Sequence, residues 1–125
     1  MATIIIADDD PVTRTTLSIM LEDEGHEVFE AGDSAETLNL LEDTEVHLVF
    51  MDMVLPDCEP GEGITVVKNT APDATIIAMT GQPESGSLSV LAKNAGCKEC
   101  LIKPFEKNRV LALTRKLLAA RGHRV

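Results

Sequence analysis

The chain has 125 residues, of which 44% are apolar, and carries 21 acidic against 11 basic residues for a formal net charge of -10. This length accommodates one compact domain, so we predict a single domain over residues 1–125. A surface this acidic argues against direct nucleic-acid binding, which relies on clustered Lys and Arg, and no apolar stretch reaches the roughly 18 residues that a membrane span needs.

The N-terminus and the cysteines indicate a cytoplasmic protein. Met1 to Thr3 lead directly into an apolar run, without the basic and apolar regions of a secretion signal. Three cysteines are an odd number, and we expect reduced thiols. Cys97 and Cys100 match C-x-x-C, but they lack the surroundings of a redox motif and the second ligand pair of a zinc site. We therefore expect no metal or redox role for them.

The chain begins with a predicted strand and helix. The strand covers Thr3 to Ala7, after which Asp10 can cap a helix and Pro11 takes its first position. This helix is expected to end near Glu24, where Gly25 follows. Apolar spacing predicts an inward stripe of Val12, Thr16, Leu17, Met20 and Leu21.

A second strand is predicted over 26–31, followed by a helix that Asp33 or Ser34 caps. The inward side of this helix is predicted to comprise Ala35, Leu38 and Leu41. The third strand, 46–51, is almost continuously apolar, as a strand covered on both faces of a parallel sheet should be. A turn-rich loop then leads to a helix that begins near Gly63.

The remaining pattern predicts a fourth strand over 74–79, a polar stretch over 82–87 and a fourth helix. One face of that helix is predicted to comprise Leu88, Leu91, Ala92 and Ala95. A fifth strand follows over 99–102, and the last helix runs from Phe105 onward. Its buried face is predicted to comprise Val110, Leu113 and Leu117, with Leu111 and Leu118 beside them. Alternating strands and helices are typical of βαβ units on a parallel sheet.

Four predicted strands end in polar residues: Asp8 and Asp9, Asp52, Thr80, and Lys103. Because the carboxyl ends of parallel strands lie along one edge, where open α/β folds bind ligands, we expect these residues to share a pocket. Three carboxylates would repel one another without a cation. Mg²⁺ prefers oxygen ligands and commonly bridges carboxylates and phosphate oxygens, so the pattern predicts a magnesium and phosphate site.

These segments resemble the receiver domain of bacterial two-component response regulators over essentially the whole chain. The motifs that carry the resemblance are 4–11 with Arg14, 51–57, 79–81 and 101–105. The resemblance implies a flavodoxin-like (βα)5 doubly wound α/β fold with a five-stranded parallel sheet of order 2-1-3-4-5. It also implies a cis peptide bond between Lys103 and Pro104.

The resemblance implies a role for each pocket residue. Asp52 corresponds to the phosphoacceptor, Thr80 to the switch hydroxyl and Lys103 to the phosphate contact, while the small Gly81 leaves the pocket open to the donor. The implied Mg²⁺ ligands are Asp9 directly, Asp8 through water, Asp52, and the backbone carbonyl of Val54. The protein would then be a phosphoacceptor that assists its own phosphorylation and dephosphorylation rather than an enzyme.

The implied donor is a histidine kinase or a histidine phosphotransfer protein. The implied reader is an unidentified downstream protein or output domain, which senses the surface of the fourth helix, the fifth strand and the fifth helix. For the isolated chain we expect a monomer or a weak dimer.

Two features depart from the family pattern. Cys100 occupies the position where receivers usually carry Tyr or Phe, so either the output surface differs or the switch runs through 82–87. The loop after Asp52 is about three residues longer than usual, with Glu59 to Gly61 as the expected insertion. The insertion either reshapes partner docking or extends a surface loop, and we favour the surface loop.

Two other functions compete with this interpretation. Asp8 to Val12 also fit the nucleophile motif of haloacid-dehalogenase-like phosphatases, in which Asp8 would carry the phosphoryl group. Those enzymes need an acidic pair after the Lys, and only Glu106 follows Lys103 closely. The second alternative is a docking module that no longer takes phosphate, for which Cys100 is the best support.

Overall fold

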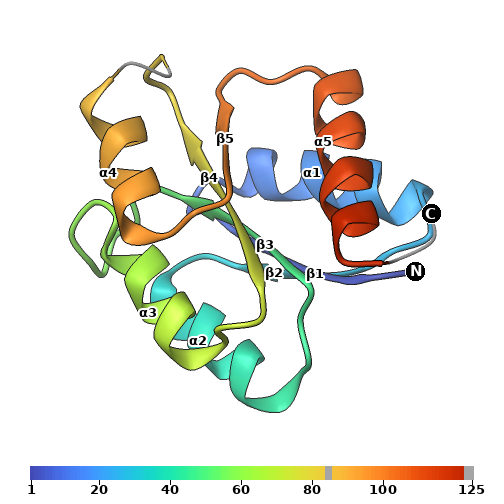
Figure 1. Ribbon diagram of the computed structural model, residues 1–125, viewed down its shortest axis with the longest axis horizontal. Coiled ribbons are helices and arrows are strands. Elements are labelled where there is room, and N and C mark those ends of the chain that lie inside the picture. The colour runs from blue at the N-terminus through green and yellow to red at the C-terminus, as the bar shows by residue number, and fades with distance from the viewer. Residues whose placement is uncertain (84–85, 123–125) are drawn as a thin grey trace.

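Five parallel strands form one sheet of order β2-β1-β3-β4-β5 in the computed structural model, which describes residues 1–83 and 86–122 (Figure 1). The strands are β1 (Thr3–Ala7), β2 (Glu27–Ala31), β3 (Leu48–Asp52), β4 (Thr75–Thr80) and β5 (Glu99–Ile102). The helices are α1 (Pro11–Asp23), α2 (Ser34–Asp43), α3 (Glu62–Thr70), α4 (Ser87–Ala95) and α5 (Lys107–Ala120). The predicted fold class and strand order are confirmed.

Helices cover both faces of the sheet, α1 and α5 on one side and α2, α3 and α4 on the other (Figure 1). Side chains alternate along each strand, so one run of residues supplies two cores. In β1, Ile5 packs toward α2, α3 and α4, while Ile4 and Ile6 pack toward α1 and α5. Because β1, β3 and β4 are buried on both faces, they lack polar side chains except near their ends.

Two element boundaries differ from the prediction by two residues. β3 starts at Leu48 rather than at residue 46, because pairing with β1 begins at Ile4 opposite Leu48. His47, just before it, uses its ring Nδ1 to accept the N–H of Thr3 at 3.0 Å. α5 starts two residues later than predicted, since Glu106 has extended backbone angles and forms the N-cap.

The predicted inward faces are partly wrong for α1, α2 and α4. Val12, Thr16 and Ala35 are exposed, and Leu91 is 42% exposed. The residues buried in their place are Ser18, Thr37 and Ser89. The apolar period locates a helix face only to within a residue or two, and small polar residues can lie against the sheet. For α5 the prediction is confirmed, because Val110, Leu113, Leu117 and Leu118 are all buried.

Within the described residues, no helix combines the length and the apolarity needed to cross a membrane. The predicted polar stretch 82–87 includes Glu84 and Ser85, which lie outside the described residues.

Candidate functional site

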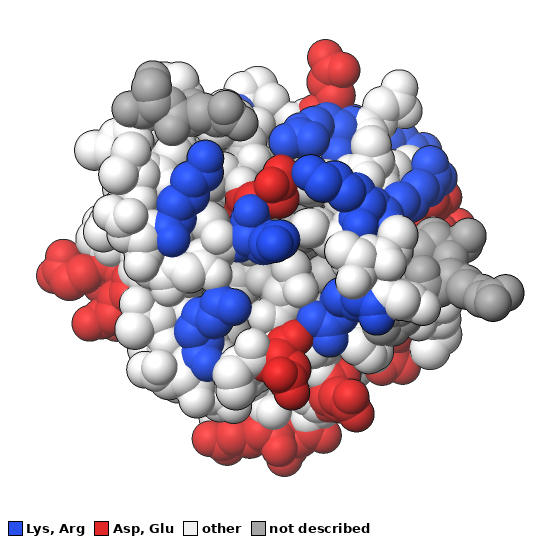
Figure 2. Space-filling model, in the orientation of Figure 1, with Lys and Arg blue, Asp and Glu red and all other residues white. Residues whose placement is uncertain are grey.

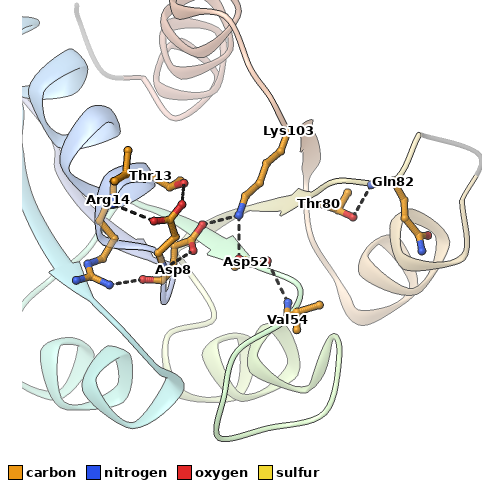
Figure 3. A network of polar contacts seen from close by, with 10 residues as sticks. Asp8, Thr13, Arg14, Asp52, Val54, Thr80, Gln82 and Lys103 are labelled. Atoms are coloured by element: carbon orange, nitrogen blue, oxygen red, sulfur yellow. Dashed lines mark hydrogen bonds and ion pairs between the residues drawn. The ribbon is translucent and has the colours of Figure 1, made fainter.

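Three polar side chains meet at the carboxyl edge of the sheet. The Lys103 Nζ atom lies 2.6 Å from Oδ2 of Asp8 and 2.9 Å from Oδ2 of Asp52 (Figure 3). Asp8 and Asp52 are neighbours because Ala7 pairs with Met51 where β1 and β3 run side by side. β4 separates β5 from β3, and the long side chain of Lys103 spans that distance. The predicted convergence of these three residues is confirmed.

Three carboxylates stand close enough to share one cation. Asp8, Asp9 and Asp52 each present an oxygen atom, and these atoms lie within 4.8 Å of one another. Asp8 is buried, Asp52 is half-buried and Asp9 is exposed. All the donor atoms are carboxylate oxygens, and the exposed side leaves room for water ligands, so the set fits a hard divalent ion such as Mg²⁺.

Burial and charge shift the pKa values of the two central groups. Burial raises the pKa of the Asp52 carboxyl above its ordinary value, although the bonds from Lys103 and from the N–H of Val54 oppose this. For Lys103, burial alone would lower the pKa of the ammonium, but the hydrogen bonds to Asp8 and Asp52 outweigh it and the pKa is raised. Lys103 is therefore a fixed positive charge at neutral pH.

The loop between β1 and α1 holds Asp8 in place. Oδ1 of Asp8 accepts the N–H of Asp10 at 2.9 Å, and the Arg14 guanidinium donates to the Asp8 carbonyl at 2.6 Å. Asp10 caps α1 by accepting the N–H of Val12 and the hydroxyl of Thr13, and these bonds lower its pKa. As predicted, Asp10 is the N-cap of this helix.

Val54 follows Asp52 closely in the loop after β3. Its N–H donates to Oδ1 of Asp52 at 3.1 Å (Figure 3). The metal-binding role of its backbone carbonyl stays a prediction.

Thr80 ends β4 beside the pocket and is 2% exposed. Its Oγ1 accepts the N–H of Gln82 at 3.1 Å, and its carbonyl accepts the N–H of Lys103 at 2.7 Å. The position of Gly81 is open, because a Cβ there would meet nothing within 4 Å. Thr80 is therefore hydrogen-bonded both to Lys103 in the pocket and to Gln82 in the segment that leads toward α4.

Gln82 is a positioning residue that the sequence pattern did not reveal. Its side-chain oxygen accepts the N–H of Leu88 at 2.9 Å and so caps α4. The signal that could have revealed it is Gly86 at the N-cap position, which has no side chain to offer. Gln82 bonds both Thr80 and α4, so it lies between the pocket and that helix (Figure 3).

Two cysteine thiols lie together at the position where receivers usually carry Tyr or Phe. Cys100 is 5% exposed, with its Sγ 3.9 Å from Sγ of Cys97 and 4.0 Å from the carbonyl oxygen of Ser89. Burial and the neighbouring Cys100 raise the pKa of the Cys97 thiol to about 12, so it is protonated at neutral pH. The inner side of α4 thus packs directly on β5.

The chain matches the family model described as "Response regulator receiver domain" over residues 4–115. This chain belongs to that family. The Lys103–Pro104 peptide bond of this receiver domain is cis, as the resemblance implies.

Curated relatives support the same assignment. The receiver domain is 32% identical over 118 residues to the aerobic respiration control protein ArcA of Escherichia coli K12, covering 93% of this chain and 48% of ArcA. It is 33% identical over 117 residues to the transcriptional regulator NtrC of Azospirillum brasilense, covering 94% of this chain and 24% of NtrC. The chain thus spans half or less of the length of these relatives.

Solved structures agree with these relatives. A CheY-like receiver domain protein from Methanospirillum hungatei matches with a TM-score of 0.90 at 30% identity, covering 98% of this chain and 97% of that one. The chemotaxis regulator CheY4 of Vibrio cholerae matches with a TM-score of 0.87 at 25% identity, covering 94% of this chain and 99% of that one.

The domain is accordingly a receiver module of two-component signalling, and receiver domains as a class are phosphoacceptor modules rather than conventional enzymes. The acidic cluster agrees with the Mg²⁺ binding of this family. Neither the phosphatase nor the docking-module alternative is favoured.

Proposed function

We propose that Asp52 accepts a phosphoryl group from a phosphohistidine on a histidine kinase or a histidine phosphotransfer protein. A carboxylate oxygen of Asp52 forms the new bond to phosphorus while the bond from phosphorus to the imidazole nitrogen breaks. The departing imidazole keeps that electron pair and takes up a proton. The product is an acyl phosphate on this chain.

The difference in exposure between the two candidate nucleophiles carries this assignment. The side chain of Asp52 is 12% exposed, whereas that of Asp8 is 1% exposed and is held by Lys103 and by the N–H of Asp10. A donor protein can therefore reach Asp52 from solvent, while Asp8 lies beneath. This geometry favours a receiver over a phosphatase that would use Asp8.

The other pocket residues have separate roles in binding the phosphoryl group and the metal ion. Lys103 stabilises the negative charge of the incoming phosphoryl group, and Asp8, Asp9, Asp52 and the carbonyl of Val54 would hold Mg²⁺. Bound Mg²⁺ supplies charge neutralisation for three carboxylates that Lys103 alone leaves with an excess of two negative charges. We further propose that the same pocket assists phosphorylation by small donors and later hydrolysis of the acyl phosphate.

A groove beside the pocket is suited to the donor. It has a volume of about 350 Å³ and is lined by Val12, Thr13, Thr16, Lys103, Pro104 and Phe105. Val12 is 72% exposed at the start of α1. An apolar surface of this kind, next to Lys103, would let a donor helix pack while its phosphohistidine reaches Asp52.

We propose that the switch runs from Thr80 to α4. If the Thr80 hydroxyl turns toward the phosphoryl group, it releases the N–H of Gln82, whose side chain caps α4. The output would then be a change in the capping of α4 by Gln82, and this route needs no aromatic ring at position 100. Because the phosphodonor proteins act in the cytoplasm, we also propose a cytoplasmic location. From the length of the chain we propose a single domain over residues 1–125.

Intact-mass measurement after incubation with acetyl phosphate and Mg²⁺ tests the assignment. The wild type should gain the mass of one phosphoryl group, and neither Asp52→Asn nor a sample with excess chelator should gain it. Labelling of Asp52→Asn would overturn the assignment to Asp52, and absence of labelling from every sample would favour the docking module.

A further inference from the structure

Cys97 and Cys100 form a second group of metal-binding side chains, outside the acidic pocket. Their Sγ atoms are 3.9 Å apart, Cys97 is half-buried and Cys100 is 5% exposed. The sequence argues against zinc here, because zinc needs a second pair of ligands. That argument does not apply to an ion that needs only two ligands, so the proximity of the two sulfur atoms reopens the question of a metal.

The turn between α4 and β5 brings the two thiols together. α4 ends at Gly96, whose φ is 112°, and the N–H of Cys97 donates to the carbonyl of Ala92 at 3.1 Å. Cys100 lies in β5, and its Sγ is 4.0 Å from the carbonyl oxygen of Ser89 in α4. One thiol is thus fixed by the end of a helix and the other by a strand, so the backbone preorganises the pair.

Two sulfur ligands at this spacing suit one soft metal ion. With metal–sulfur bonds of about 2.3 Å, two sulfur atoms 3.9 Å apart enclose an angle of roughly 115° at the ion. Thiolates select soft ions such as Cu⁺. Within residues 1–83 and 86–122, the acidic cluster is the one group of three or more His, Cys, Asp or Glu that could hold a metal. The thiol pair therefore suits Cu⁺, which needs only two strong ligands, better than zinc.

We propose that Cys97 and Cys100 together bind one Cu⁺ ion. Each thiol releases its proton, and each sulfur donates an electron pair to the ion. One Cu⁺ and two thiols thus give a complex with a net charge of -1 and two free protons, and nothing is oxidised or reduced. A coordinated thiol is deprotonated by the metal itself, so the protonated state of Cys97 in the absence of metal does not prevent binding.

Positive side chains near the pair offset the charge of this complex. Burial and Cys100 raise the pKa of the Cys97 thiol to about 12, while Lys93 acts in the opposite direction, which places its ammonium close to the sulfur. Cε of Lys68 would lie 3.2 Å from a Cβ at Gly96, just before Cys97. Figure 2 shows Lys and Arg gathered over the face formed by α4, β5 and α5. A complex with a charge of -1 is therefore better tolerated here than elsewhere on this acidic chain.

A disulfide fits the pair less well than a metal ion. The two sulfur atoms would have to close from 3.9 Å to about 2.05 Å. The Cys97 thiol is also protonated at neutral pH, and a protonated thiol is a poor nucleophile. Coordination of one ion requires little movement of either sulfur atom.

The test adds Cu⁺ to the unphosphorylated protein without oxygen, in competition with bathocuproine disulfonate, a coloured Cu⁺ chelator. Native mass spectrometry should show one copper per chain, and X-ray absorption should show two sulfur neighbours. Cys97→Ser should bind Cu⁺ at least about a hundredfold more weakly, because it loses the second arm of a chelate. Cys58→Ser is the matched control, since Cys58 is half-buried like Cys97 but lies outside the pair. Its affinity should stay within about twofold of the wild type.

Equal weakening in both variants would overturn the proposal. So would oxygen ligands in place of sulfur, a copper shared between two chains in sedimentation, tighter binding of Zn²⁺, or loss of the copper to an excess of glutathione. If Cys97→Ser fails to fold, the wild type still decides, because bound Cu⁺ should raise its thermal midpoint and an unchanged midpoint would contradict the site. Asp52→Asn should bind copper like the wild type, so this result does not depend on phosphoryl transfer.

Discussion

Lys103 and Asp52 lie 51 positions apart in the chain, yet their Nζ and Oδ2 atoms are 2.9 Å apart. Lys103 also contacts Asp8, so one ammonium stands between two carboxylates that would otherwise repel each other. We therefore expect the pocket to depend on Lys103 for its stability, in addition to the phosphate contact that we propose for this residue.

Replacement of Lys103 by Met should destabilise the fold by about 2 kcal/mol when no divalent ion is present, because it leaves the Asp8 and Asp52 carboxylates without a neighbouring cation. Urea unfolding measures the change. Added Mg²⁺ should recover part of the loss, since it would bind only the folded carboxylate cluster. The control Lys116→Met removes an exposed ammonium 3.8 Å from Glu99 and should cost less than about 0.5 kcal/mol. An equal loss in both variants would contradict the central place of Lys103.

Asp57 connects the loop after β3 to α2. Its carboxylate accepts the N–H and the hydroxyl of Ser34 and the N–H of Ala35, and these bonds lower its pKa from the ordinary value of 3.8. Asp57 thus acts as an N-terminal cap of α2. Its replacement by Ala should lower the free energy of unfolding of the protein by about 1 kcal/mol at neutral pH.

The pH dependence of this loss has a definite sign. Because the folded pKa of Asp57 is depressed, its contribution is present above pH 3.8 and disappears as the pH falls through the lower folded value. Unfolding curves of wild type and Asp57→Ala should therefore converge in acid. Asp43→Ala, at the C-terminal end of α2, should instead change stability by no more than about 0.3 kcal/mol, toward stabilisation. A constant difference at all pH values would count against the cap.

Gly61 marks where the long loop after Asp52 returns to the body of the domain. Its φ is 82°, and an added Cβ would lie 3.1 Å from Cγ of Leu91 in α4. The predicted insertion is therefore not entirely a free surface loop, because Gly61 is buried whereas Glu59 and Pro60 are exposed.

Gly25→Ala provides a matched comparison for Gly61→Ala. Gly25 has a φ of 90° with nothing within 4 Å, so its substitution should cost only the backbone term of about 1 kcal/mol. Gly61→Ala should cost roughly 1 kcal/mol more, because Leu91 must also move. In a Leu91→Ala background the two costs should become equal, as judged by thermal unfolding. A persistent gap would show that Leu91 is not the obstacle.

Thr80 should separate phosphorylation from its output. With acetyl phosphate and Mg²⁺, Thr80→Ala should still take up one phosphoryl group, because Asp52 and Lys103 are unchanged. Most of the phosphorylation-induced amide shifts in α4 should be lost, since the bond to Gln82 is absent. Thr80→Ser keeps the hydroxyl and should retain those shifts. If Thr80→Ala responded fully, the proposed route through Gln82 would be wrong.

Apolar runs, helix caps and the polar residues after four of the strands were enough to predict a parallel sheet and the meeting of Asp8, Asp52 and Lys103. Such features are local, and a parallel sheet turns them into spatial relations because every strand ends at the same edge. The strand order came from the resemblance to receiver domains. The strand boundaries were accurate to two residues because the apolar runs that mark them are local features too.

The relations that escaped prediction all involve contacts across loops or helix faces. Asp57 capping α2, Gln82 capping α4 and Gly61 beneath Leu91 depend on the path of a loop, which no periodicity encodes. The greater exposure of Asp52 over Asp8 likewise emerges only when the helices have packed on the sheet. Packing chooses the rotation of each helix and the route of each loop by excluding volume among residues distant in the chain, and a linear pattern does not record that exclusion.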